Sequence, residues 1–156
     1  MSKIKRYFKR FKHLSLLQKK DITEAIYRLS SVSAQLKYRS IDWFWEKCHE
    51  KVALEIGVET KEQIIAEQLK VANNVHESIR LASRLLPFSC ECVPRSIVLR
   101  DMLREKGITA QIIIGVNKAN LSLQSHAWVE VHDRVIGERE DLKTTFKSID
   151  VSSSKE

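Results

Sequence analysis

Residues 89–108 of the 156-residue chain read SCECVPRSIVLRDMLREKGI, and this stretch predicts a helix with two marked ends. Pro94 suits the first turn of a helix, where its missing N–H costs nothing. Gly107 suits the position just after the last turn, where glycine easily adopts a left-handed conformation. Between these marks apolar residues recur at helical spacing: Ile97, Val98, Leu99, Met102 and Leu103. The N-terminus of the helix therefore falls at Cys92 or one residue after it.

The segments before this helix are also helical in pattern. Asp21, with Glu24 three residues later, predicts the cap of a helix whose apolar stripe runs to Leu36. Ser40 predicts the cap of a second helix that stops at Gly57. A third helix begins at Thr60 and ends before Pro87, since a residue before proline is pushed out of the helical region. We expect a break in this helix near residues 73–74.

The segments after Gly107 are strand-like. Residues 109–116 form a β-branched run, and residues 125–132 alternate between apolar and polar positions. We expect a loop over residues 117–124, a turn at Asp133–Arg134 and a third strand from Val135. Helices followed by strands predict an α+β fold, in which one central helix carries Cys92 and packs on a small antiparallel sheet.

The charge is concentrated at the N-terminus. The net charge is +7, but residues 1–20 hold eight Lys or Arg and no acid, which leaves 19 basic against 20 acidic residues in the remainder. We divide the chain into a basic amphipathic arm (1–20), a helical region (21–72), a catalytic core (73–150) and a frayed tail (151–156), with 21–150 as one compact unit. A nucleic-acid-binding domain usually spreads its basic residues over a folded face, so no nucleic-acid partner is expected. Contact of residues 1–20 with an anionic membrane surface stays open as the less favoured alternative.

Composition points to a cytoplasmic protein. No apolar run reaches the length of a membrane span, and the N-terminus lacks the apolar core of a signal peptide. Three cysteines are an odd number, which fits a secreted disulfide framework poorly. Cys90-x-Cys92 lacks the spacing of structural zinc sites, so no metal is expected, and without a nucleotide-binding motif we expect no cofactor.

Cys92 is the candidate nucleophile. The unpaired N–H groups and the positive dipole end of a helix N-terminus favour a thiolate, which is the reactive form, and can hold an oxyanion in acyl transfer. Cys90 lies two residues further out and gains less from this field. We interpret Cys90 as a buried small residue without a chemical role.

His126 is the candidate base, because a thiolate nucleophile needs a base that an acceptor holds in place. It lies at the start of the second predicted strand, and a hairpin brings Glu138 within cross-strand reach. Glu140 and Asp141 are the alternative acids. Alone, a histidine on a strand is more often structural, and only the cysteine and the acid change that interpretation.

Two motifs in the sequence resemble one known family. CVPRSIVLRDMLREKGITAQIIIGV, followed by SHAWVEVHDRVIGE, is similar to the C-terminal part of the lasso-peptide leader peptidases, which are transglutaminase-like cysteine proteases. The matching positions are Cys92, Arg95, Ser96, Gly107, Ile108, Gly115, Val116 and His126 to Glu130. The resemblance extends over roughly residues 12–140. It implies a transglutaminase-like or papain-like core with N-terminal helices.

The resemblance also implies an activity and partners. Cys92 corresponds to the nucleophile and His126 to the base of a protease that removes the leader from a ribosomally made precursor peptide. The family's aspartate position falls on Glu138, which departs from the pattern. The chain has no room for a fused leader-binding domain, so a separate leader-binding recognition protein and a lasso cyclase are the implied partners. A non-catalytic peptide-binding module and an amide–amine transglutaminase stay open as alternatives.

Overall fold

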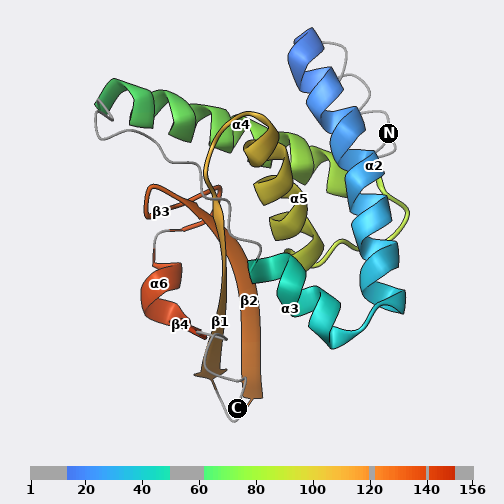
Figure 1. Cartoon of the computed structure of the whole chain (residues 1–156), viewed down its shortest axis with the longest axis vertical. Coiled ribbons are helices and arrows are strands. Elements are labelled where there is room, and N and C mark those ends of the chain that lie inside the picture. The colour runs from blue at the N-terminus through green and yellow to red at the C-terminus, as the bar shows by residue number, and fades with distance from the viewer. Residues whose placement is uncertain (1–13, 50–61, 120–121, 140, 150–156) are drawn as a thin grey trace, which may run out of the picture.

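The computed structural model describes residues 14–49, 62–119, 122–139 and 141–149. The helices come first and a small antiparallel sheet follows, which confirms the α+β prediction (Figure 1). The first 13 residues of the expected basic arm (1–20), the Gly57 stop and the Thr60 start lie outside these residues, whereas residues 16–20 of the arm form the start of the first described helix. The elements are α2 (Leu16–Tyr38), α3 (Ile41–His49), α4 (Glu62–Leu85), α5 (Cys92–Glu105), β1 (Gln111–Ala119), β2 (Ser122–Val131), β3 (Arg134–Val135), α6 (Leu142–Thr145) and β4 (Lys147–Ser148).

Helix α2 begins earlier than predicted. Ser15 caps it in a capping box, in which the Ser15 hydroxyl accepts from the N–H of Gln18 and the Gln18 side chain accepts from the N–H of Ser15. Asp21, the predicted cap, lies inside the helix, where it is buried and pairs with Lys106 at 3.1 Å. The predicted cap was wrong because Ser15 and Gln18 already satisfy the free N–H groups, and the Asp21 carboxylate instead ties α2 to the end of α5.

The starts and interiors of helices α3 and α4 test three of the predictions. The Ser40 hydroxyl accepts from the N–H of Trp43 at 3.3 Å, which confirms Ser40 as a cap. Helix α4 runs without a break through residues 73–74, where the Asn73 side chain donates to the Leu69 carbonyl at 2.9 Å. An asparagine that finds its partner within the helix does not interrupt it, so the expected break was wrong. Helix α4 ends at Leu85, before Pro87, as predicted.

Helix α5 is the central element and contacts α2, α4, β1 and β2. It begins at Cys92 and ends in a Schellman motif. Gly107, at φ +73°, donates to the Arg104 carbonyl, and the buried Ile108 donates to the Leu103 carbonyl, both at 3.0 Å. Both ends that Pro94 and Gly107 predicted are therefore confirmed.

The middle of α5 is buried and includes charged groups. The guanidinium of Arg100, which is 1% exposed, donates to the Lys47 carbonyl and pairs with Asp101 at 2.7 Å. A buried charge needs such partners to offset its desolvation. This contact joins the end of α3 to α5, and it lies on the same helix as Cys92.

The sheet has the order β3-β2-β1-β4, with β1 and β2 antiparallel from Gln111↔Glu130 to Ala119↔Ser122. The strands therefore occupy most of residues 117–124, where we expected a loop. Residues 122–125 are exposed, Leu123 included, so this end of the hairpin is held by backbone pairing and not by the burial of an apolar face. The predicted turn is also one residue off, since His132 and Asp133 have positive φ values of 49° and 59° and Arg134 already pairs with Val131.

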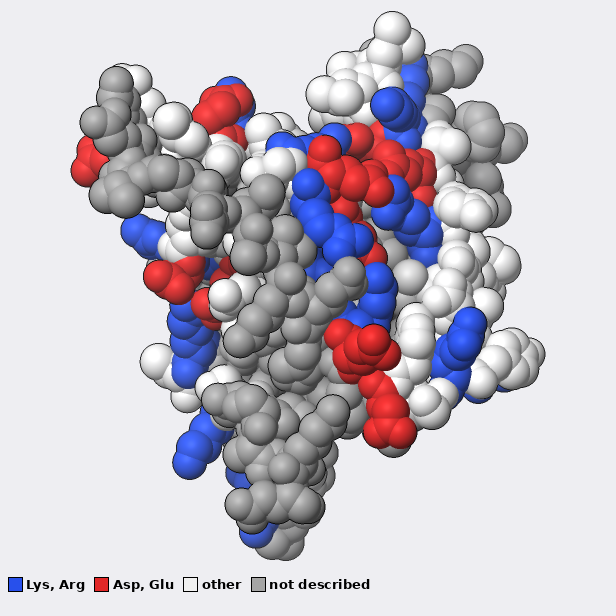
Figure 2. Space-filling model, viewed as in Figure 1, with Lys and Arg blue, Asp and Glu red and all other residues white. Residues whose placement is uncertain are grey.

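Acidic and basic side chains are interspersed on the described surface. Figure 2 shows them side by side where α2 meets the C-terminal end of α5. Arg28 lies there between two acids, at 2.8 Å from Glu24 and 2.5 Å from Glu105. Such paired charges neutralise one another and leave no field of a single sign at this junction. Within the described residues, no helix combines the length and the apolarity that crossing a membrane requires.

Candidate active site

Cys92 is the first residue of α5, and its half-buried side chain borders a pocket between α5 and β2. The residue before it, Glu91, occupies the N-cap position, but its side chain makes no capping hydrogen bond. The N–H groups of this helix start are therefore not capped by that side chain, in contrast to the start of α2. They can act as donors to an oxyanion that develops beside the Cys92 sulfur.

His126 and Glu138 form a hydrogen-bonded pair. The His126 Nε2 atom and the Glu138 Oε2 atom are 2.9 Å apart, and the two side chains are 24% and 27% exposed. A neutral imidazole whose Nε2 donates to the carboxylate keeps Nδ1 free as an acceptor. The carboxylate thus fixes both the tautomer and the orientation of the ring, as a base that acts on a thiol requires.

His126 lies inside β2, not at the start of the strand as the sequence suggested. Its backbone partner on β1 is Gly115. The His126 ring stacks on Trp128 at 6.3 Å between centroids and lies 5.6 Å from the ring of Phe146. Two aromatic neighbours restrict the imidazole to few orientations.

Gly115 makes room for this aromatic cluster. A Cβ atom at Gly115 would lie 2.8 Å from the Cβ of Phe146 and 2.8 Å from the Trp128 ring. Any larger residue would push one of the two rings away from its place. The glycine of β1 is therefore part of the framework that holds His126.

Ser96 joins the two elements that carry Cys92 and His126. It lies one turn after Cys92 on α5, is buried, and donates its hydroxyl to the Ala127 carbonyl at 3.1 Å. Ala127 follows His126 directly. One hydrogen bond thus fixes the start of α5 against the histidine-bearing part of β2.

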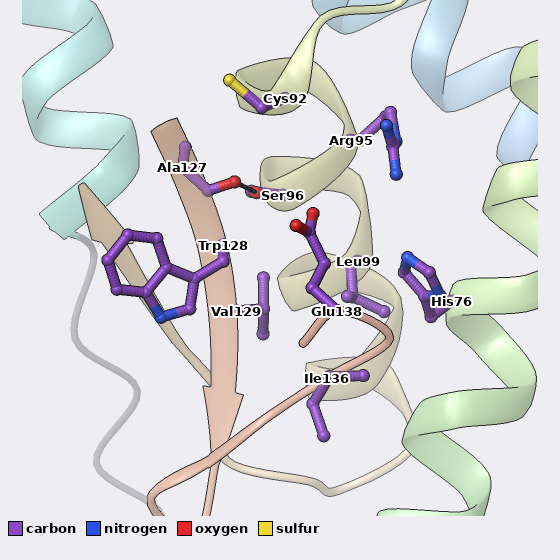
Figure 3. A pocket seen from close by; sticks show the side chains of 10 residues that line it. All are labelled: His76, Cys92, Arg95, Ser96, Leu99, Ala127, Trp128, Val129, Ile136 and Glu138. Carbon is purple, nitrogen blue, oxygen red and sulfur yellow. Dashed lines mark hydrogen bonds between the residues drawn. The ribbon is translucent and has the colours of Figure 1, made fainter. Parts of the chain in front are cut away.

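The pocket brings Cys92 and Glu138 to one place. It is a small, shallow pocket that opens to solvent, and its interior has room for little more than one water molecule. In Figure 3 the Glu138 carboxylate points into it, while the Cys92 sulfur points away from that carboxylate. The lining residues are His76, Cys92, Arg95, Ser96, Leu99, Ala127, Trp128, Val129, Ile136 and Glu138.

The hydrogen bonds of the described residues include none between the Cys92 thiol and the His126 imidazole. In this structure His126 is hydrogen-bonded to Glu138, and Cys92 lines the same pocket as Glu138. The thiol is not hydrogen-bonded to the imidazole. Catalytic hydrogen bonds in ligand-free sites are often long and shorten when the substrate binds. Rotation of the thiol about its Cα–Cβ bond is the smallest movement that would change its distance to the ring.

Two further polar side chains, Arg95 and His76, line the pocket but take no part in the His126–Glu138 hydrogen bond. Arg95 lies one turn after Cys92, and its buried Nε has no hydrogen-bond partner among the described residues. His76, from α4, is 7% exposed. Burial, followed by the nearby charge of Arg95, lowers the pKa of His76 below its ordinary value of 6.5, so this imidazole is neutral at pH 7.

The other candidate residues lie elsewhere. Asp141 binds Arg139 at 2.7 Å and begins α6, so this carboxylate is engaged away from His126. Glu140 lies outside the described residues. Cys90 is half-buried, 4.0 Å from the Ser33 hydroxyl, and burial raises the pKa of its thiol. Burial raises the pKa of Cys48 to about 11.

Three residues contribute to this site in ways that the sequence did not predict. Ser96 is one of the positions that match the leader peptidases, but its hydrogen bond to β2 was not predicted, although a polar residue within the apolar stripe of α5 could have indicated a tertiary hydrogen bond. Phe146 gave no signal, because it follows the last recognised strand and reaches His126 only through the return of the chain along β1. His76 gave no signal, because nothing in its local sequence shows that the fold brings it to the pocket, and no cluster of three or more metal-ligating side chains exists within the described residues.

Comparison with known proteins places this arrangement in a class. Residues 30–151 match the family model described as the transglutaminase-like superfamily. The chain belongs to this superfamily, whose members are mostly cysteine-dependent enzymes. No curated protein and no solved structure matches the chain with significance.

Proposed function

We propose that this protein is a cysteine peptidase that removes the leader from a ribosomally made lasso-peptide precursor. The observation that carries the proposal is the His126–Glu138 hydrogen bond at 2.9 Å beside the helix start that bears Cys92. Membership of the transglutaminase-like superfamily supports the thiol chemistry. The choice of substrate rests on the resemblance of the Cys92 helix and the His126 strand to the leader peptidases.

The proposed reaction has two halves. The Cys92 thiolate attacks the carbonyl carbon at the junction of leader and core, and the N–H groups at the start of α5 hold the oxyanion. Imidazolium His126 then gives its proton to the leaving amine, the C–N bond breaks and a thioester remains. Neutral His126 takes a proton from water, the resulting hydroxide attacks the thioester, and the thiolate is released with a free carboxylate.

Partners follow from the same proposal. A separate leader-binding protein would deliver the precursor to the pocket, and a cyclase would use the freed N-terminus of the core.

The Arg95 guanidinium, with its buried Nε lacking a partner among the described residues, is suited to hold a substrate oxygen.

The decisive experiment is mass spectrometry of precursor peptide after incubation with the protein, with and without the leader-binding protein. We expect cleavage at one site, loss of cleavage in Cys92→Ala and in His126→Ala, and nearly full activity in Cys90→Ala. Removal of a general base typically costs about 10²–10⁴-fold in rate. Activity that survives in Cys92→Ala but not in Cys90→Ala would refute the assignment of the nucleophile.

Thiol labelling tests the chemistry without a substrate. An activated Cys92 should react with iodoacetamide faster than Cys90 and Cys48 at neutral pH, because burial raises the pKa of the other two thiols. Equal rates for Cys92 and Cys90 would favour a non-catalytic peptide-binding module. Incorporation of an added amine into the peptide, in place of hydrolysis, would identify an amide–amine transglutaminase.

A further inference from the structure

His76 lies against the backbone of the segment that carries the proposed acid. A Cβ atom at Gly137 would lie 2.0 Å from the Nδ1 atom of His76 and 2.3 Å from two carbons of its ring. No side chain fits in that space. The imidazole therefore occupies the position where any other residue would place its Cβ, and Glu138 is the next residue along the chain.

The Gly137 backbone is suited to this contact. Its φ is +72°, in the left-handed region that glycine adopts without strain. The chain bends there, after the buried Ile136, whose N–H donates to the Val129 carbonyl at 3.0 Å. The segment from Ile136 to Glu138 is thus fixed to β2 on one side and meets His76 on the other.

The support behind His76 is rigid. Helix α4 packs against α2 and α5, and its neighbouring residues Ala72, Val75 and Ile79 are buried in the core. A side chain on such a helix has a fixed place relative to α5, where Cys92 begins. In Figure 3 His76 and Glu138 project toward the same region of the pocket from opposite elements.

We propose that His76 is a positioning residue, which sets the place of Glu138 through its contact with Gly137 and so orients His126. Without the ring, the Gly137 backbone gains room to move toward α4, and Glu138 moves with it. A small displacement is enough to disturb the function of a catalytic group. This inference rests on the proposed function, because it concerns the acid of the same site.

The test is a double-mutant cycle that uses His76→Ala and Gly137→Ala. The readout is the rate of Cys92 alkylation by iodoacetamide as a function of pH, which needs no substrate. Each single variant should lower the rate at neutral pH by about ten-fold, the lower end of what loss of an orienting partner costs. His76→Phe, which keeps a ring in place, should restore most of the rate.

The cycle separates positioning from backbone strain. Alanine at φ +72° is strained in either background, so this cost cancels. In the His76→Ala background the added methyl has room, and the second substitution should lower the rate little further. Fully additive losses would overturn the proposal, as would an unchanged pH profile in a folded His76→Ala protein.

The result also distinguishes the two proposals. A wild-type Cys92 that reacts no faster than Cys90 contradicts the proposed function. A fast wild-type Cys92 whose rate is indifferent to His76 contradicts only the positioning role. Unfolding by urea, monitored on each variant, shows which proteins are folded under the assay conditions.

Discussion

At the scale of single residues, the site depends on the length of one side chain. Glu138 stands at the position that is an aspartate in the leader peptidases that the sequence resembles. The extra methylene of glutamate is used, because the carboxylate reaches Nε2 of His126 at 2.9 Å. The departure from the family pattern is therefore compatible with a working acid. It also makes the usual conservative substitution a disruptive one.

We expect Glu138→Asp to be less active than the wild type, since it withdraws the carboxylate by about 1.5 Å, the length of one C–C bond. Glu138→Gln keeps the length and loses the charge. Both variants should lower kcat with little change in KM, and the loss of kcat in each should be smaller than in His126→Ala. Steady-state kinetics of peptide cleavage measures this, and Asp141→Asn is the matched control. Loss of activity confined to Asp141→Asn would remove Glu138 from the site.

At the scale of elements, two glycines separate effects on the fold from effects on the site. Gly107 ends α5 at φ +73°, and a Cβ there would meet nothing within 4 Å. Gly115 lies in β1 with ordinary backbone geometry but has no space for a Cβ beside Trp128 and Phe146. One position is constrained by conformation, and the other by packing.

We expect Gly107→Ala to cost about 1 kcal/mol of stability through its left-handed backbone and to leave activity unchanged. Gly115→Ala should cost about 1–3 kcal/mol by overpacking. It should also lower activity, because the displaced rings flank His126. Urea unfolding and peptide cleavage on both variants make the comparison. Equal activities in the two variants would show that the aromatic cluster does not hold the base.

The helices of the chain were easier to predict than its sheet. The ends of α5 followed from Pro94 and Gly107, because proline and glycine each restrict the backbone locally. The full length of the β1–β2 hairpin was not predicted, because its exposed end pairs through backbone groups that carry no sequence signature. The His126–Glu138 contact was predicted from a short turn, whereas the contact of His76 with Gly137 joins residues whose proximity depends on the entire fold.

At the scale of the whole molecule, stability should vary with pH through His76. Burial and then Arg95 lower its pKa below 6.5, and the charges of Glu77, Glu138 and Arg80 also act on it. Between the folded and the unfolded pKa values the unfolded chain binds more protons. The free energy of unfolding therefore falls as the pH is lowered from about 6.5.

We expect His76→Phe to reduce this loss of stability. Urea unfolding at about pH 7.5 and about pH 5.5, in the wild type and in the variant, provides the comparison. The other titrating groups are present in both proteins, so their contributions largely cancel. An equal loss in the two proteins would show that His76 takes up a proton as easily in the folded chain as in the unfolded one.

The stacking of Trp128 on His126 has a consequence for how the protein can be observed. An indole beside an imidazole emits less light when that imidazole gains a proton, so the fluorescence of Trp128 should follow the charge of His126. The chain holds only two other tryptophans, Trp43 and Trp45, and replacing both with phenylalanine would leave Trp128 as the single emitter. The protein would then contain its own optical indicator of the state of the base, readable on the timescale of a single turnover.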